Sequence, residues 1–380
     1  MNRTHRKLFA GVAATLVLTA ALAVTALRAQ NGAPSGAKAN PTLPWGSAYF
    51  MVDPFWPKPL PNDWLTGSVG GICVDKNDNV ITVQRTADSN NFNDHEKELA
   101  VPSPPFIVYD PAGNVIKTWG DYSVVPNGIH DCYVDYEGNI WVGGNADAIA
   151  QKYSPDGKLL LQIGEKQKFD TDTGKQNGKP LNASKTLLNR PSSFAVDPAN
   201  GDVYITDGYG NRRVVVFDKN GKYIRQWGRQ ATKEETEKGV GGVFEEVVHS
   251  IVMSKDGLLY VSDREGQRIQ IFDKQGNFQK AIVLPRRRAD LPGKAEVYWV
   301  LLSRDADQKY MFVLAGNDEA MHIVERKSGR IIESFGQSGH MAGQFSYLHS
   351  GAINSKNELF LAETITGRRV QKFKVVKPLP

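Results

Sequence analysis

Short apolar runs alternate with polar turns along most of the chain. Residues 191–228, PSSFAVDPANGDVYITDGYGNRRVVVFDKNGKYIRQWG, hold four runs rich in β-branched and aromatic residues, with Asp, Asn and Gly in the turns between them. The segment from His249, HSIVMSKDGLLYVSDREGQRIQIFDKQGNFQKAIV, repeats this pattern, and further copies start near Gly71, Gly128, Val297 and His349. Outside the first 29 residues no segment has a sustained helical period. The pattern predicts six repeated units of four strands each.

Six such units predict an all-β fold, a six-bladed β-propeller, in which radial repetition leaves few strand edges exposed. The last copy ends at KFKVV, residues 372–376, and is one strand short. The segment YFMVDPF, residues 49–55, is apolar and rich in β-forming residues, and belongs to no copy. We expect it to supply the missing outer strand, so that the two ends of the chain close the ring.

The first residues predict a targeting segment. Three basic residues precede an apolar run over residues 8–27, and Ala29 ends a typical cleavage site. This arrangement indicates a secretory signal peptide, residues 1–29, and therefore export to the periplasm or the extracellular space. Residues 30–44 predict a flexible tether, and residues 45–380 the propeller. An uncleaved leader would be long enough to anchor the protein in a membrane; once it is removed, we expect no stable membrane insertion.

Charge and cysteine content narrow the class of protein further. The chain has a formal net charge of +5, and residues 1–29 hold four basic and no acidic residues, so the remainder carries +1. A nearly neutral propeller lacks the basic stripe that neutralises phosphates, and we expect no nucleic-acid partner. The two cysteines, Cys73 and Cys132, lie in apolar strand patterns, which predicts buried free thiols rather than a redox pair.

Three histidines occupy the same position of the repeat in every second unit. In each case the turn of the following hairpin comes eight residues later, at Gly138, Gly257 or Asn357. Alternate blades of a six-bladed ring lie about 120° apart, so the three imidazoles should converge on the central axis. Three histidines with one open coordination position form a typical catalytic zinc site. The sequence therefore predicts zinc bound by His130, His249 and His349.

Strand direction decides which loops lie near these histidines. Each histidine begins an inner strand and the second strand runs antiparallel, so the loop after the second strand returns to the histidine face. That face collects three candidate catalytic residues and three long loops, namely Arg85, Tyr209, Arg264 and residues 86–104, 165–190 and 229–247. Two guanidiniums bind a carboxylate well, and a tyrosine beside cations ionises more easily and can act as a general base. We expect a small carboxylated or peptidyl substrate on this face.

Other charged residues and histidines are predicted to be structural. An acid ends the second strand and an arginine begins the third in several units, giving the pairs Asp207–Arg213, Asp263–Arg268 and Glu363–Arg369. Because the arrangement recurs, we expect these residues to pair within their blades and exclude them from the site. Single histidines outside the repeat position are expected to be structural or on the surface; they are His5, His95, His322 and His340.

The chain resembles the peptidyl-α-hydroxyglycine α-amidating lyases, six-bladed propellers built of NHL-type repeats. The similarity covers most of residues 45–377 and is strongest in the two segments quoted above. The resemblance implies that the three repeat histidines bind a catalytic zinc, that Tyr209 is the catalytic tyrosine and that Arg85 and Arg264 are active-site arginines. It also implies the reaction, which is cleavage of a peptidyl-α-hydroxyglycine into a peptide amide and glyoxylate.

The resemblance is weaker for calcium and for disulfides. The family has an acid directly after the third histidine that helps to bind a structural calcium ion, and this chain has Ser350 there. The other calcium ligands of the family are backbone carbonyls, at positions matching Ile72 and Cys132. Calcium prefers anionic oxygen ligands, so losing the carboxylate disfavours it. The cysteines that form the family's disulfides are missing as well.

Three functions remain open on the sequence alone, because propellers support many activities. The first is an exported zinc-dependent lyase that acts on a peptidyl-α-hydroxyglycine or a related α-hydroxy substrate. The second is a non-catalytic NHL-repeat propeller that binds a protein or a glycan outside the cytoplasm. A calcium-dependent lactonase ranks last, because the inner strands begin with histidines rather than with acidic and amide residues. We expect a monomer in each case.

Overall fold

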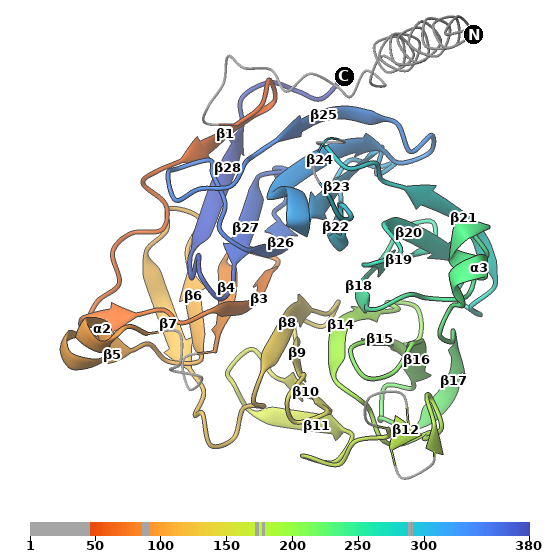
Figure 1. Ribbon diagram of the computed structural model, residues 1–380. Helices are drawn as coiled ribbons and strands as arrows, with labels where there is room; N and C mark the ends of the chain where they lie inside the picture. The colour runs from red at the N-terminus through yellow and green to blue at the C-terminus, as the bar shows by residue number, and fades with distance from the viewer. Residues whose placement is uncertain (1–45, 86–91, 172–174, 177–178, 288–289, 291) are drawn as a thin grey trace, which may run out of the picture.

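Six sheets are arranged radially around a central axis in the computed structural model (Figure 1). The structure describes residues 46–380 apart from 86–91, 172–174, 177–178, 288–289 and 291. The predicted leader and tether, residues 1–29 and 30–44, lie outside the described residues. Each of the six sheets has four antiparallel strands. The prediction of an all-β six-bladed propeller is confirmed.

The first three blades are regular in chain order from the inner to the outer strand. Blade 1 consists of β3 (Val69–Val74), β4 (Val80–Gln84), β6 (Phe106–Tyr109) and β7 (Val115–Trp119). Blade 2 consists of β8 (Ile129–Val134), β9 (Ile140–Gly144), β10 (Ile149–Tyr153) and β11 (Leu159–Ile163). Blade 3 consists of β14 (Pro191–Val196), β15 (Val203–Asp207), β16 (Arg213–Phe217) and β17 (Tyr223–Trp227).

The remaining blades follow the same order except for the last outer strand. Blade 4 consists of β18 (Val248–Met253), β19 (Leu259–Asp263), β20 (Arg268–Phe272) and β21 (Phe278–Val283). Blade 5 consists of β22 (Val297–Leu302), β23 (Tyr310–Ala315), β24 (Ala320–Glu325) and β25 (Ile331–Phe335). Blade 6 consists of β26 (Leu348–Ile353), β27 (Leu359–Glu363), β28 (Val370–Val375) and the N-terminal β1 (Phe50–Asp53).

The ring closes through β1, as the sequence predicts. Strand β1 pairs antiparallel with β28, with Phe50 opposite Val375 and Asp53 opposite Lys372. The Phe50 side chain is fully buried, and its ring lies 5.4 Å from that of Phe312 in blade 5. This pairing satisfies the backbone hydrogen-bonding groups along the outer edge of β28. Burial of Phe50 against blade 5 also helps to hold the last two blades together.

Burial explains why three strands of each blade are nearly continuous apolar runs. Inner strands of neighbouring blades contact one another around the whole ring, with β26 returning to β3. Sheets stacked in this way are covered on both faces, so strands such as β16 and β23 are buried at every residue. The outermost strands border solvent, and β11 is accordingly exposed along most of its length. The hydrophobic core therefore lies between blades.

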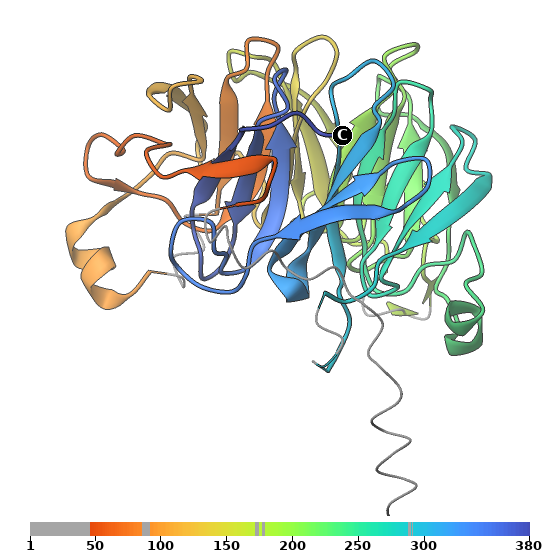
Figure 2. The ribbon, with the colours of Figure 1, turned by 90° about the horizontal axis from the view of Figure 1, so that it is seen from above.

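The described parts of the long loops and the short helices share one face of the ring. Loop 86–104 contains α2 (Asp94–Leu99), loop 165–190 contains the strand pair β12 (Lys175–Gln176) and β13 (Lys179–Pro180), and loop 229–247 contains α3 (Lys233–Glu237). Figure 2 shows α2 and α3 below the blades, on the same side as the short helix η2 (Gly316–Asp318). A two-residue parallel pair, β2 (Trp64–Leu65) and β5 (Val101–Pro102), completes the described strands. Among the described helices, none has the length and apolar character needed to cross a membrane.

The two cysteines form a disulfide, so the prediction of free thiols is wrong. Cys73 on β3 and Cys132 on β8 are both buried, and their Cα atoms lie 5.2 Å apart. Both residues come from inner strands, and the inner strands of adjacent blades approach closely near the axis. The bridge therefore joins blade 1 to blade 2 across a sequence separation of 59 residues.

Removing this disulfide should lower stability. A cross-link that closes a loop of this length restricts the unfolded chain and contributes about 2–4 kcal/mol to the free energy of unfolding. We expect denaturant unfolding of a Cys73→Ala, Cys132→Ala double variant to show a loss in this range. A reducing agent should destabilise the wild-type protein and leave the double variant unaffected. Equal stability of the oxidised wild type and the variant would contradict the prediction.

A buried histidine away from the axis should make stability depend on pH. His322 on β24 is 1% exposed, and its Nδ1 lies 2.6 Å from the Ser334 hydroxyl. Burial, with a smaller contribution from the charge of Arg287, lowers the pKa of His322 from 6.5 to about 4. Between these values the unfolded chain binds the proton more readily, so stability is complete above about pH 6.5 and falls as pH drops towards 4.

We therefore expect a His322→Gln variant to lose less stability than the wild type between pH 7 and pH 4. The full shift corresponds to about 3 kcal/mol. Denaturant unfolding of both proteins at a series of pH values measures the difference, in which the contributions of the other histidines cancel. Parallel pH profiles of the two proteins would refute this role of His322.

Candidate functional site

The three repeat histidines converge at the axis, as the sequence predicts. Each is the second residue of an inner strand in alternate blades, with His130 on β8, His249 on β18 and His349 on β26. They are 2%, 0% and 3% exposed, and their ring centroids lie 4.7–5.1 Å apart. One nitrogen from each ring can be chosen so that all three lie within 4.8 Å of one another. Ligands of a tetrahedral zinc lie about 3.4 Å apart, so small side-chain movements suffice to share one ion.

The intervening blades orient two of these imidazoles. Nδ1 of His130 lies 2.8 Å from the carbonyl oxygen of Ser192, and Nδ1 of His249 lies 2.7 Å from that of Tyr298. Ser192 and Tyr298 are themselves the second residues of the inner strands β14 and β22. A carbonyl only accepts, so each Nδ1 must carry the hydrogen and each Nε2 keeps its lone pair. This is the tautomer in which Nε2 binds a metal.

Tyr209 lies against the same two histidines. It belongs to the loop between β15 and β16, and its hydroxyl oxygen is 2.9 Å from Nε2 of His130 and 3.0 Å from Nε2 of His249. The single phenolic hydrogen can be donated to only one of these two lone pairs. The converging imidazole nitrogens therefore present more lone pairs than there are hydrogens to occupy them. Such a set of nitrogen ligands suits a divalent cation of intermediate softness. The cluster can therefore hold a metal ion.

Burial keeps the histidines neutral, which is the form that binds a metal. It lowers the pKa of His130 to about 3, and the charges of Arg85 and Arg264 add to this effect. Burial likewise holds the pKa values of His249 and His349 well below 6.5, with the neighbouring cationic groups contributing. A protonated imidazole has no lone pair for a metal, so the low pKa values keep the ligand set available at neutral pH.

The two arginines border this cluster from equivalent places. Arg85 directly follows β4 and Arg264 directly follows β19. Nη1 of Arg264 is 3.5 Å from the Tyr209 hydroxyl, and its guanidinium lies over the rings of Tyr209 and Tyr298 at 5.5 and 5.4 Å. Arg85 donates from Nε to the carbonyl oxygen of Ile129 next to His130. The structure thus brings together all six residues that the sequence singled out.

Two opposing effects act on the pKa of Tyr209, and its ionisation beside a bound metal stays a prediction. Burial raises the pKa of Tyr209, while the charges of Arg264 and Arg85 oppose that rise. Desolvation of a phenol enclosed by the inner strands opposes the effect of the arginines and is not visible in the sequence. Arg264 also has anionic neighbours of its own, at 3.1 Å in Glu265 and 3.5 Å in Glu296.

An acid that the sequence argument passed over lies directly after the first histidine. Asp131 is 2% exposed, and its carboxylate accepts hydrogen bonds from the backbone N–H groups of Cys132 and Phe194. Burial raises the pKa of Asp131 to about 8, while the hydrogen bonds from these backbone groups oppose that rise. Ser350, after the third histidine, is fully buried and its hydroxyl has no partner among the described residues. Comparing the residue after each histidine would have found Asp131.

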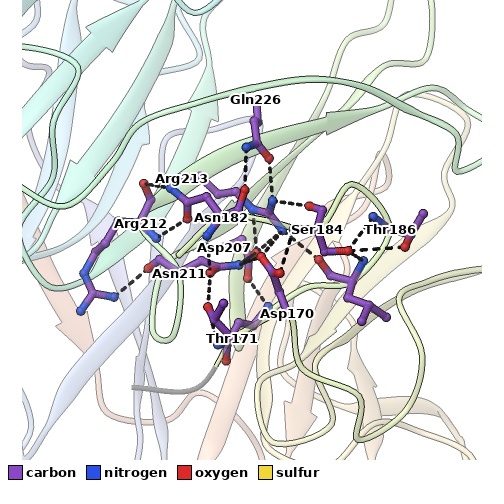
Figure 3. Close-up of polar contacts among 12 residues, drawn as sticks. Asp170, Thr171, Asn182, Ser184, Thr186, Asp207, Asn211, Arg212, Arg213 and Gln226 are labelled. Carbon is purple, nitrogen blue, oxygen red and sulfur yellow. Dashed lines mark hydrogen bonds and ion pairs between the residues drawn. The ribbon is translucent and has the colours of Figure 1, made fainter. Parts of the chain in front are cut away.

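The predicted acid–arginine pairs lie within their blades and support the loops above them. The carboxylates of Asp207, Asp263 and Glu363 lie 2.9, 2.7 and 2.7 Å from their arginines Arg213, Arg268 and Arg369. In blade 3 the network extends into the loop before β14. Figure 3 shows Asn211 between Asp207 and Asp170, with Arg213 also reaching Ser184. This buried cluster holds both ends of the five-residue loop that carries Tyr209.

Comparison with known proteins agrees with this fold. The NHL repeat family matches residues 188–217 and 248–272. Peptidyl-glycine alpha-amidating monooxygenase B of Xenopus laevis is 29% identical over 233 residues, which are 57% of this chain and 24% of that protein. A probable peptidyl-alpha-hydroxyglycine alpha-amidating lyase of Caenorhabditis elegans is 25% identical over 310 residues, or 78% of this chain and 80% of that protein. A streptogramin B lyase structure, 13% identical, aligns with a TM-score of 0.54 over 87% of this chain and 99% of its own.

The predicted resemblance to amidating lyases is confirmed by these relatives together with the repeats and the propeller. The match covers about a quarter of the length of the amidating monooxygenase, and most of the length of the nematode lyase. The likeness to the streptogramin B lyase concerns the fold alone.

The geometry predicts one divalent transition-metal ion per chain. Metal analysis of the purified protein, beside a variant with His130, His249 and His349 changed to Ala, should show the ion in the wild type and its loss in the variant. His340→Ala, which removes an exposed histidine, serves as the control and should retain the metal. If neither protein bound a transition metal after zinc was supplied, the cluster would not be a metal site.

Proposed function

We propose that the protein is an exported zinc-dependent lyase that releases glyoxylate from a peptidyl-α-hydroxyglycine or a related α-hydroxy substrate. The observation that supports this most strongly is the position of the Tyr209 hydroxyl, 2.9 and 3.0 Å from two of three converging histidines and 3.5 Å from an arginine. A proton acceptor, a metal-ligand set and a carboxylate-binding cation then lie within one small volume. Relatives named as amidating lyases support the reaction class.

In this proposal His130, His249 and His349 would hold zinc, and carbonyl groups of the neighbouring blades hold the Nδ1–H groups of His130 and His249. Bound zinc would polarise a substrate oxygen, lower the pKa of a hydroxyl group bound to it and favour the phenolate of Tyr209. Arg264 or Arg85 binds the substrate carboxylate through paired hydrogen bonds. The carboxylate end of the substrate is thereby fixed beside Tyr209.

Tyr209 then removes the proton of the substrate hydroxyl group. The oxygen's electrons form the aldehyde C=O of glyoxylate as the C–N bond breaks, and the leaving nitrogen takes up a proton to become the peptide amide. Atoms balance without water, oxidant or reductant, since an N-acyl-hydroxyglycine divides into an amide and glyoxylate. The phenol, once protonated, can return that proton to the departing nitrogen.

Export is part of the same proposal. It rests on the basic and apolar leader predicted over residues 1–29. The Cys73–Cys132 disulfide supports it, because such bonds persist mainly in oxidising compartments. The near-neutral propeller leaves us expecting no nucleic-acid partner, and a monomer is proposed as the oligomeric state.

A Tyr209→Phe variant should test the proposed chemistry. We expect kcat for glyoxylate release from an N-acyl-α-hydroxyglycine to fall by about 10²–10⁴-fold, because general-base catalysis is lost, while KM and metal content stay close to wild type. Tyr223→Phe on the outer strand of the same blade is the matched control and should retain full activity. A zinc-loaded wild type that releases no glyoxylate would refute the substrate, and full activity of Tyr209→Phe would refute the role of the phenol.

A further inference from the structure

The loop that carries Tyr209 is enclosed on two sides. It consists of residues 208–212, between β15 and β16. A Cβ added at Gly208 would lie 2.0 Å from the carbonyl oxygen of Val248, and one added at Gly210 would lie 2.0 Å from the side-chain oxygen of Asn189. The loop is therefore pressed between the start of β18, which carries His249, and the segment that precedes β14. The phenol position depends on how this short stretch of backbone is held.

Arg212 donates hydrogen bonds to backbone carbonyl groups of this loop. Its Nη1 lies 2.9 Å from the carbonyl oxygen of Gly208, 2.7 Å from that of Asn211 and 3.3 Å from that of Tyr209. The side chain is 9% exposed, so these hydrogen bonds are largely shielded from water. One guanidinium nitrogen thus contacts the carbonyl groups of Tyr209, of the residue before it and of the second residue after it.

Both ends of Arg212 are anchored. Its backbone N–H donates to the side-chain oxygen of Asn182, 2.9 Å away, and its carbonyl oxygen accepts from the same side chain, which Figure 3 shows. At the other end, Nη2 lies 3.3 Å from the carboxylate of Glu246, three residues before His249. The arginine therefore connects the tyrosine loop to the segment that leads into the second histidine.

The same repeat position in blade 6 behaves differently. The segment ETITGRR, residues 363–369, has the length and the double arginine of DGYGNRR, residues 207–213. Its first arginine, Arg368, turns to the carboxylate of Glu96 on α2, at 2.6 and 2.9 Å. The residue that matches Tyr209 there is Ile365, which is 40% exposed. Contact with the loop carbonyls is thus a property of Arg212 and not of the repeat.

We infer that Arg212 is a positioning residue: it fixes the loop backbone so that the Tyr209 hydroxyl lies between Nε2 of His130 and Nε2 of His249. The spectroscopic test below needs no catalysis, and only its kinetic counterpart rests on the proposed function. Arg212 acts through Tyr209, and we assign it no contact with the substrate.

The first experiment follows Tyr209 directly by ¹⁹F NMR of protein labelled with 3-fluorotyrosine. The Tyr209 resonance is identified by its loss in Tyr209→Phe. In Arg212→Met, which keeps the length of the side chain and removes its donors, we expect that resonance to shift and to broaden or split, with the metal content unchanged. Arg368→Met is the matched control and should leave it in place. An unchanged Tyr209 resonance in a folded Arg212→Met protein would overturn the inference.

The second experiment measures glyoxylate release by the same variants. Arg212→Met should lower kcat at least tenfold with KM within about twofold, because the base is misplaced while the carboxylate site stays intact. Arg212→Lys should recover most of kcat, since an ammonium group can also donate to the three carbonyls. A rise in KM alone, or a lysine variant as slow as the methionine variant, would contradict positioning through these hydrogen bonds.

A third variant covers the case in which Arg212→Met does not fold. Glu246→Gln removes the negative charge from a side chain that is 56% exposed. The change weakens the ion pair between this residue and Nη2 of Arg212. We expect a smaller displacement of the Tyr209 resonance in the same direction, and no displacement would count against the inference. If the wild type released no glyoxylate, the proposed function would fail, while the resonances would still decide the role of Arg212.

Discussion

The convergence of six inner strands on one axis is the constraint on which the rest of the structure depends. It brings the second residue of each strand to one level, so that His130, His249 and His349 face one another from alternate blades. The strands between them contribute carbonyl groups at the same level, which take up the Nδ1–H groups of two histidines. The placement of the three histidines, and the orientation and tautomer of His130 and His249, therefore follow from the spacing of neighbouring blades.

Features that repeat along the chain could be predicted from the sequence. The number of blades, the closing strand at residues 49–55 and the alternation of histidines all depend on counting copies of one pattern. The Asp207–Arg213 pair and its counterparts were recognisable for the same reason. Strand polarity alone then placed Arg85, Tyr209 and Arg264 on the histidine face, because the loops after second strands return to where the first strands begin.

Features that occur once could not be predicted in this way. The Cys73–Cys132 bridge needs the lateral register of two adjacent inner strands, which no periodicity reports. The direction of the Tyr209 pKa shift depends on desolvation, and that is known only when the enclosing residues are in place. Arg212 and Arg368 are each the first of two arginines at the same repeat position, yet Arg212 binds loop carbonyls and Arg368 binds a carboxylate on a helix.

The disulfide also has a mechanical consequence. The chain between Cys73 and Cys132 includes β4, β6 and β7, so the sulfur bridge bypasses most of blade 1. A force applied at the N-terminal end would first separate β1 from β28 and then β2 from β5 before it reached β3. From Cys73 the load passes directly to β8, and the enclosed strands are never drawn out. The ring therefore gives way at its seam, while the strand that bears the first histidine remains covalently tied to its neighbour.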